Sequence, residues 1–231
     1  MTHLRGVLFD LDGVLLDSRH SVVAFWEQLA QRHDVELTPQ LYVKHILGVP
    51  ARHTLDHVFP MLGENARLEV IAEIHAYEAG LRLTPMPGAI ACVTALHNNR
   101  VPIGLVTSAS RDKALQVLDA FDIREAFAGI VTASDVTCGK PHPEPYQCGA
   151  EALGLPASAC LVFEDSVSGT FSAAGAGATC IGINVLRMKG SLEIAGSCVV
   201  VQDLAAVHIE PRNDGVALHV GTRSFVIRPR T

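Results

Sequence analysis

Two aspartates, Asp10 and Asp12, stand two residues apart directly after the short apolar run at residues 7–9. This run is typical of a buried strand, and Gly13 follows where the strand would turn. Side chains two residues apart on an extended backbone point to the same side, and such neighbouring charges need a cation or a reacting group to neutralise them. The pair predicts a site where carboxylates meet a metal ion and a phosphate. The structural alternative is a pair of polar residues that cap a strand end.

Three further groups of polar residues follow predicted strands or lie between them. They are Thr107 and Ser108 after residues 101–106, Lys140 in the loop 139–146, and Glu164 with Asp165 after residues 160–163. Each group alone has a structural interpretation, as a helix cap or an exposed loop lysine. Because ligands of parallel sheets bind beyond the carboxyl ends of the strands, we expect all of these residues at one sheet edge with Asp10.

This set of residues suits phosphoryl transfer. A carboxylate can attack phosphorus to form an aspartyl-phosphate, and Mg²⁺, which prefers oxygen ligands, would lie between the two anions. Asp10 and Asp165 would give carboxylate oxygens to the ion, and Asp12 its backbone carbonyl. The Asp12 side chain would then serve as general acid and base.

The remaining candidates would orient the phosphate and neutralise its charge. Thr107 or Ser108, with nearby backbone N–H groups, would hold phosphate oxygens. Lys140 would neutralise charge on the nucleophile and the phosphoryl group. These side chains must be positioned by the strands and helices that precede them.

Apolar runs alternate with helical stretches along most of the chain. The expected strands are residues 4–9, 101–106, 129–132, 160–163 and 179–183, and the expected helices are 88–98, 111–121, 143–153 and 166–176. This alternation predicts an α/β core with a parallel sheet and helices on both faces. The tail differs, because residues 215–220 and 223–228 predict a two-stranded hairpin added to the edge of the sheet.

The segment after the first strand is helical instead. Its expected helices are residues 21–33, 39–46, 52–59 and 64–81. We therefore predict a core of residues 1–16 and 86–231 and an inserted cap domain of residues 17–85. A cap can exclude water and select substrate. Arg52 is the cap residue that we expect to contact a sugar hydroxyl or a second phosphate, unless it is an ordinary surface arginine.

Composition excludes several classes of protein. The 231 residues carry a net charge of −6, which disfavours a nucleic-acid surface. No apolar run approaches the roughly 18 residues of a membrane span, and nothing near Met1 resembles a signal peptide. The six cysteines form no CxxC pair, and the eleven histidines show no ligand spacing, which favours reduced thiols and disfavours zinc. We expect a cytoplasmic monomer that binds neither nucleic acid nor a membrane.

The order of these motifs resembles the haloacid dehalogenase superfamily. The motifs are DxDG at 10–13, a strand-end Thr or Ser, the GKP lysine at 139–141 and the acidic pair at 164–165. The resemblance, over roughly residues 4–205, implies a Rossmann-like sheet with a small α-helical cap. It also implies that Asp10 is the nucleophile and Asp12 the general acid and base. Members that cleave carbon–halogen bonds typically lack the second aspartate, so Asp12 favours phosphate chemistry.

Within the superfamily, the chain resembles sugar and polyol phosphatases close to β-phosphoglucomutase. Members that cleave carbon–phosphorus bonds have a lysine after the cap glycine, whereas Val49 follows Gly48 here. The mutase has a lysine before that glycine, where this chain has Leu47. We therefore expect a Mg²⁺-dependent phosphatase of a small sugar or polyol phosphate. A phosphosugar mutase and a non-catalytic phosphosugar-binding protein remain the alternatives.

Overall fold

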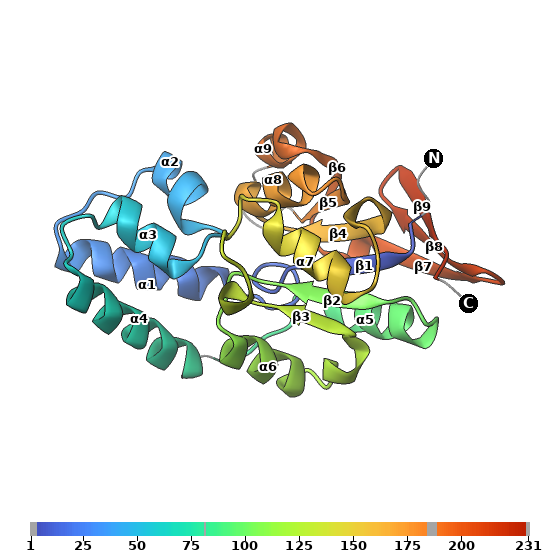
Figure 1. The fold of residues 1–231 in the computed structure, drawn as a ribbon, viewed down its shortest axis with the longest axis horizontal. Helices are drawn as coiled ribbons and strands as arrows, with labels where there is room; N and C mark the ends of the chain where they lie inside the picture. Colours follow the sequence, from blue (N-terminus) through green and yellow to red (C-terminus); the bar gives the residue numbers. More distant parts are fainter. Residues whose placement is uncertain (1–3, 81, 184–188, 230–231) are drawn as a thin grey trace.

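A parallel sheet forms the centre of the molecule in the computed structural model, which describes residues 4–80, 82–183 and 189–229. Among these residues the sheet has six strands in the order β3-β2-β1-β4-β5-β6 (Figure 1). The strands are β1 (Gly6–Phe9), β2 (Ile103–Val106), β3 (Gly129–Val131), β4 (Cys160–Glu164), β5 (Thr179–Ile183) and β6 (Ser197–Val201). The α/β fold predicted from the sequence is confirmed, and β6 is a strand that the sequence analysis missed.

Helices cover both faces of this sheet, and for that reason the central strands β1 and β2 are apolar and buried along their whole length. They are α5 (Ala89–Asn98), α6 (Arg111–Ala120), α7 (Glu144–Ala152), α8 (Val167–Gly175) and α9 (Lys189–Ala195). Val7 and Phe9 pack in one core cluster with residues of α5 and α6. Leu8, between them, packs in a second cluster with residues of α7 and α8. This alternation places β1 at the middle of the core, between β2 and β4.

The predicted helical insertion lies beside the sheet as a separate group of helices (Figure 1, blue to teal). Its elements are α1 (Arg19–Arg32), α2 (Pro39–Leu41), the π-helical turn η1 (Tyr42–Ile46), α3 (Ala51–Val58) and α4 (Glu64–Ala79). We call this group the cap. It has its own apolar cluster, which includes Trp26 stacked on Phe59 at 5.9 Å between ring centroids. The helix expected over 39–46 is divided, because the Leu47 N–H bonds to the Tyr42 carbonyl five residues back.

The chain crosses between core and cap twice, and the two crossings lie side by side. The Asp17 N–H donates to the Thr84 carbonyl, and the Met86 N–H donates to the Leu15 carbonyl, each at 2.9 Å. We call this paired segment the junction. It places the start of the cap only a few residues after Asp12 in the chain.

The tail forms a sheet of its own instead of extending the edge of the main sheet. Its antiparallel strands are β7 (Val207–Arg212), β8 (Gly215–Val220) and β9 (Arg223–Ile227). The expected hairpin is present as β8 and β9, and β7 is an additional partner. Val216 and Leu218 alternate along β8 into the core cluster that contains α5, so one face of the tail sheet is buried. The tail is therefore held by apolar burial and by a backbone bridge between Leu4 and Ile227, and not by pairing with β3 or β6.

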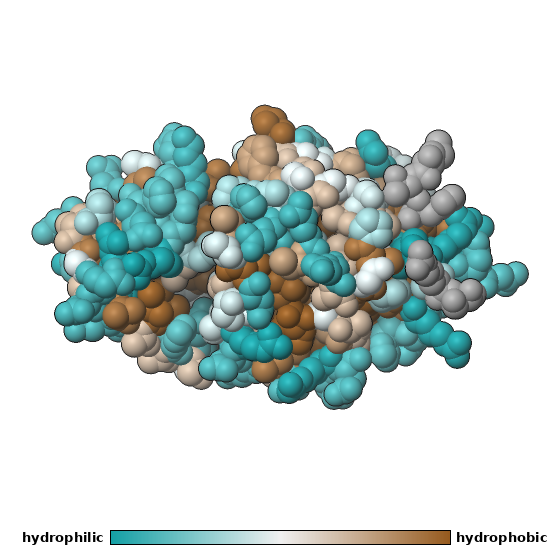
Figure 2. Space-filling view, in the orientation of Figure 1, coloured by the Kyte–Doolittle hydropathy of each residue, from teal (hydrophilic) through white to brown (hydrophobic). Residues whose placement is uncertain are grey.

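Other expectations concern the surface and the thiols. All six cysteines are free, as expected for reduced thiols. Within the described ranges, none of the helices has the length and apolar character needed to cross a bilayer. The face in Figure 2 is mixed in character, with brown side chains over α9 and a larger brown area near the centre, in the region of β3 and α6. Helix α9 carries Ile194, which is 84% exposed.

Candidate active site

Polar side chains from several strand ends converge at the carboxyl edge of the main sheet. Asp10 follows β1, Glu164 ends β4, and Lys140 reaches in from the loop before α7. The Lys140 Nζ lies 2.7 Å from Asp10 Oδ1 and 2.6 Å from Glu164 Oε1. It also donates to the Val106 carbonyl at 3.1 Å. Asp165 lies in the same place, since one of its oxygens is within 4.8 Å of oxygens of Asp10 and Glu164, so the structure brings residues 10, 140 and 165 together.

Lys140 is a buried cation between two carboxylates. Its three ammonium donors are matched by Asp10, Glu164 and the Val106 carbonyl. Burial alone disfavours the charged form, but the charges of Asp10 and Glu164 outweigh burial and raise the pKa of Lys140. Lys140 is therefore charged at neutral pH and can offset negative charge where the phosphoryl group would lie.

Glu164, to which the sequence analysis assigned no role, positions Lys140. Its Oε1 also accepts from the Tyr146 hydroxyl at 3.0 Å. Its Oε2 accepts from the Ser166 N–H at 2.9 Å and from the Ser166 hydroxyl at 3.0 Å. Ser166 in turn caps α8 by accepting from the Gly169 N–H. Because its oxygens are already satisfied, Glu164 is a positioning residue, and the neighbouring Asp165 is left for other chemistry.

Three buried carboxylates lie close together at this site. Oxygens of Asp10, Glu164 and Asp165 lie within 4.8 Å of one another. Burial raises the pKa of Asp10 to about 7, and burial followed by the charge of Glu164 raises the pKa of Asp165 well above its usual range. Gly13, at a φ of 75°, brings the backbone so near that a Cβ would clash with the Asp165 carboxylate. The carboxylate oxygens of Asp10 and Asp165 are donors that fit a hard divalent cation such as Mg²⁺.

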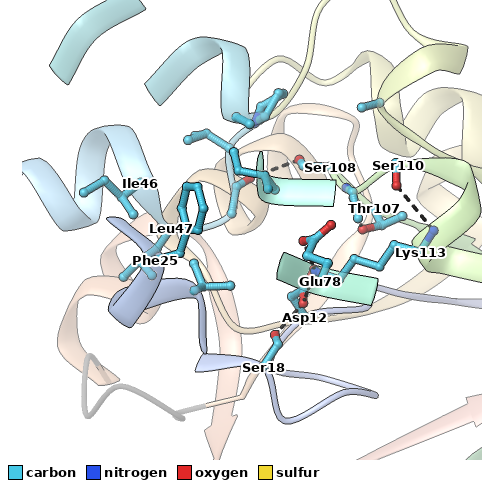
Figure 3. A pocket seen from close by; sticks show the side chains of 18 of the residues that line it. Asp12, Ser18, Phe25, Ile46, Leu47, Glu78, Thr107, Ser108, Ser110 and Lys113 are labelled. Atoms are coloured by element: carbon cyan, nitrogen blue, oxygen red, sulfur yellow. Dashed lines mark hydrogen bonds and ion pairs between the residues drawn. The ribbon is translucent and has the colours of Figure 1, made fainter. Parts of the chain in front are cut away.

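Asp12 is held by contacts that the sequence did not indicate. Ser18 donates a hydrogen bond to Asp12 Oδ1, and Lys113 of α6 approaches the two Asp12 oxygens at 2.9 and 3.0 Å (Figure 3). Lys113 also pairs with Glu78 of the cap, with 2.7 Å between Nζ and Oε1. Figure 3 shows these side chains meeting from the first loop, α6 and α4. Asp12 is therefore linked to the cap through Lys113, which contacts Glu78 of α4.

A cavity of about 290 Å³ separates the carboxylates from the cap. Asp10, Asp12 and Asp165 line its core side. Its cap side is mostly apolar and is formed by Val22, Phe25, Trp26, Ile46, Leu47, Val49, Ile71, Ile74 and Tyr77. Such a chamber has room for a small organic group attached to a phosphate at the carboxylates.

Thr107, Ser108 and Arg52 all line this cavity, but each is also engaged elsewhere. The Thr107 hydroxyl accepts from the Ala109 N–H at 3.0 Å, and the Ser108 hydroxyl donates to the Gly48 carbonyl at 3.2 Å. The Arg52 guanidinium forms two hydrogen bonds to Glu64, of 2.7 and 2.6 Å. Their contacts to substrate stay predictions.

The chain matches the sequence profile of the haloacid dehalogenase-like hydrolases over residues 7–183, and it belongs to that family. It is 36% identical over 214 residues to the validoxylamine A 7'-phosphate phosphatase of Streptomyces hygroscopicus subsp. limoneus, covering 88% of this chain and 97% of the relative. It is also 36% identical over 188 residues to hexitol phosphatase A of Escherichia coli, covering 78% and 83%.

A solved structure agrees with this assignment. A putative β-phosphoglucomutase from Bacteroides vulgatus superposes with a TM-score of 0.77 at 25% identity, covering 88% of this chain and 86% of that one. The predicted family is confirmed. The predicted enzyme class, a phosphoric monoester hydrolase, is confirmed as well, because the matched family is one of hydrolases and both relatives named above are phosphatases.

Proposed function

We propose that the protein is a Mg²⁺-dependent phosphatase that hydrolyses a small sugar or polyol phosphate through an aspartyl-phosphate. The observation that carries this proposal is the contact of Asp10 with the buried Lys140. The Asp165 carboxylate lies beside them, with an oxygen within 4.8 Å of an Asp10 oxygen. Mg²⁺, held by Asp10, Asp165 and the Asp12 backbone carbonyl, would neutralise charge between the carboxylate and the phosphate.

The chain's own residues account for both steps of the reaction. The Asp10 carboxylate attacks phosphorus, and the bond from phosphorus to the ester oxygen breaks. Asp12 gives its proton to the departing alkoxide. Asp12 then takes a proton from water, which attacks the same phosphorus and releases inorganic phosphate and free Asp10. Throughout, Lys140 offsets charge at Asp10, and the cap limits the access of bulk water.

The substrate class follows from the cavity and the relatives together. The cavity admits a group of modest size, and its polar residues, such as Ser21, Ser108 and Glu78, offer partners for hydroxyls. The relatives named above are phosphatases whose names refer to validoxylamine A 7'-phosphate and to hexitols. A phosphorylated sugar or polyol satisfies both observations, because such molecules combine apolar C–H surfaces with hydroxyl groups.

A phosphosugar mutase is the second candidate, favoured by the likeness to a putative β-phosphoglucomutase. A mutase must keep its phosphoaspartate until the sugar returns. Leu47 stands before the cap glycine, and its carbonyl accepts from the Ser168 hydroxyl at 3.1 Å. At that position the chain therefore has a backbone contact to the core and no side-chain amine that could bind a sugar phosphate, which disfavours the mutase.

A panel of phosphate esters with Mg²⁺ tests the proposal. We expect metal-dependent release of inorganic phosphate from sugar or polyol phosphates, and Asp10→Asn should lower the rate by at least about a thousandfold. Asp122→Asn, at an exposed loop position, is the matched control and should keep the wild-type rate. Near-native turnover by Asp10→Asn would rule out the covalent route. Interconversion of hexose phosphates without phosphate release would favour the mutase, and tight binding without turnover would favour a binding protein.

A further inference from the structure

Three histidines gather on the cap, and none of them is among the residues that line the cavity above Asp10, Asp12 and Asp165. His45 lies in η1, and His53 and His57 lie one turn apart on α3. One ring nitrogen from each lies within 4.8 Å of the others. The expectation that the histidines lack ligand spacing is therefore wrong, because the π-helical turn brings His45 beside a helix that starts six residues later.

Local hydrogen bonds fix this arrangement. The Thr54 hydroxyl donates to the His45 carbonyl at 2.6 Å and ties η1 to α3. The His45 Nδ1 and the His53 Nε2 lie 3.0 Å apart. The His53 and His57 rings stack with 4.1 Å between centroids. The three rings thus share one small region of the cap surface, with His57 exposed and the other two half-buried.

Backbone carbonyls orient two of these rings. The His57 Nδ1 donates to the His53 carbonyl at 2.9 Å, which leaves the His57 Nε2 with its lone pair. The backbone of Lys44 is a further hydrogen-bond partner of His53. Histidines that ligate metals commonly donate their second ring N–H to such a partner, which fixes the tautomer and the ring orientation.

The charge state also suits a metal. Burial, followed by the proximity of His57, lowers the pKa of both His45 and His53. Both imidazoles are therefore neutral at pH 7 and have lone pairs that need not first lose a proton.

We propose that His45, His53 and His57 form a binding site for a divalent transition metal of the Zn²⁺ class, separate from the Mg²⁺ site. Nitrogen ligands at about 2.0–2.1 Å in a tetrahedral shell lie about 3.3 Å apart. The 3.0 Å between the His45 and His53 nitrogens is close to that spacing, and the exposed His57 can turn to complete three ligands. Solvent would fill the fourth position. Three imidazoles select Zn²⁺, Co²⁺ or Ni²⁺ over Mg²⁺, which prefers oxygen.

The site would brace a segment that joins cap and core. Leu47 and Gly48 lie between His45 and His53, and their carbonyls accept from Ser168 and Ser108 of the core. A metal ion whose ligands come from both sides of this segment would hold η1 to α3. Binding should therefore raise the unfolding temperature as well as change the spectrum of a bound metal.

Titration of the full-length protein with Zn²⁺ or Co²⁺ under saturating Mg²⁺ tests the site. The background should be Asp165→Asn with Cys138→Ser, because a second group, formed by Cys138, His142 and Glu144, has ligand atoms equally near one another. We expect one Co²⁺ per chain, with the absorption of a tetrahedral site and a rise in the unfolding temperature. His57→Ala, at an exposed position that folding tolerates, should weaken binding at least about tenfold.

Matched variants decide the assignment. His53→Ala should abolish the Co²⁺ absorption, whereas replacement of His97, an exposed histidine on α5, by alanine should leave it unchanged. Absence of stoichiometric Co²⁺ binding would overturn the proposal, as would equal binding by His57→Ala and His97→Ala. Because the background variant removes a predicted Mg²⁺ ligand, the outcome does not depend on whether the phosphatase proposal holds.

Discussion

Glu78 of the cap helix α4 accepts a hydrogen bond from Lys113 of the core helix α6, with 2.7 Å between Oε1 and Nζ. Both side chains are largely shielded from solvent, at 18% and 7% exposure. The same ammonium also lies 2.9 Å from Asp12, the proposed general acid. One lysine therefore connects the position of the cap with the orientation of the Asp12 carboxylate.

Replacing Lys113 should slow the chemistry more than it weakens binding. Lys113→Met removes the cation that holds the Asp12 carboxylate, and we expect kcat to fall about tenfold or more while KM changes little. Lys113→Arg should restore part of the rate, since it keeps a cation in reach. Arg111→Met, an exposed residue on the same helix, is the control. Steady-state phosphate release measures all three, and an unchanged kcat for Lys113→Met would contradict the assigned role.

Replacing Glu78 should expose the coupling between cap and core. In the absence of substrate, we expect Glu78→Gln and Lys113→Met each to lower the free energy of unfolding. The double variant should lose less than the sum of the two, with an interaction energy of about 1 kcal/mol. Glu73→Gln, on the same helix but paired with Arg32, should be additive with Lys113→Met. If the losses of unfolding free energy from Glu78→Gln and Lys113→Met were additive, the two residues would not be energetically coupled.

Lys140 should be essential for the stability of the metal-free protein. Lys140→Met leaves the buried carboxylates of Asp10 and Glu164 without their shared cation, and breaking such a pair typically costs about 3–5 kcal/mol. Urea unfolding in the presence of a chelator measures this loss. Lys44→Met, at an exposed cap position, should change the unfolding free energy by less than about 0.5 kcal/mol. Added Mg²⁺ should recover part of the loss if the ion binds these carboxylates.

Replacing Arg52 should show whether the cap contributes to substrate recognition. Arg52→Ala should raise KM for the true substrate and hardly affect a small aryl phosphate, because the generic ester does not reach the cap wall. Arg32→Ala is a close control, since Arg32 also forms two hydrogen bonds to a cap glutamate. Equal effects of Arg52→Ala on both esters would remove Arg52 from recognition. The pairing of Arg52 with Glu64 would then be its whole role.

Glu144 should make stability depend on pH. It accepts from the Thr137 and Cys138 N–H groups and so anchors the loop that carries Lys140. The hydrogen bond from the Thr137 backbone, followed by that from Cys138, lowers the pKa of Glu144. A lowered pKa means that the stabilisation is complete above the ordinary glutamate value and is lost as pH falls through the folded value. The wild type should therefore lose more stability than Glu144→Gln between pH 6 and pH 3, and parallel pH profiles would refute this.

Strongly periodic or apolar segments made most of the fold predictable from the sequence. The strand at residues 179–183 has the expected bounds, and the four expected core helices lie within a residue of theirs at each end. The failures have physical causes. The division at residue 42 depends on a shift in backbone hydrogen bonding that side-chain periodicity does not reveal. The separate tail sheet depends on which face of β8 meets α5, and that is a tertiary contact.

The candidate site was predictable only where its residues lie near strand ends. Asp10, Asp12 and Asp165 follow apolar runs, so their convergence follows from the parallel sheet. Lys113 and Glu78 do not follow an apolar run, because each lies within a helix, far in sequence from Asp12. Nothing local indicates that a lysine on α6 is buried against two carboxylates. The histidine group was only partly predictable, because the spacing of His53 and His57 is visible in the sequence, whereas His45 joins them only once η1 and α3 lie side by side.

The paired junction between cap and core has a mechanical consequence. Its two segments are joined by backbone hydrogen bonds, so any rotation of the cap would have to bend them together. Asp12 lies near this pivot, tied through Ser18, while the far ends of the cap helices lie well beyond it. A given rotation then carries those distant helix ends a long way and the carboxylates hardly at all. Such a rotation would leave Asp10 and its neighbours assembled, so that product could depart while the site keeps its arrangement for the next turnover.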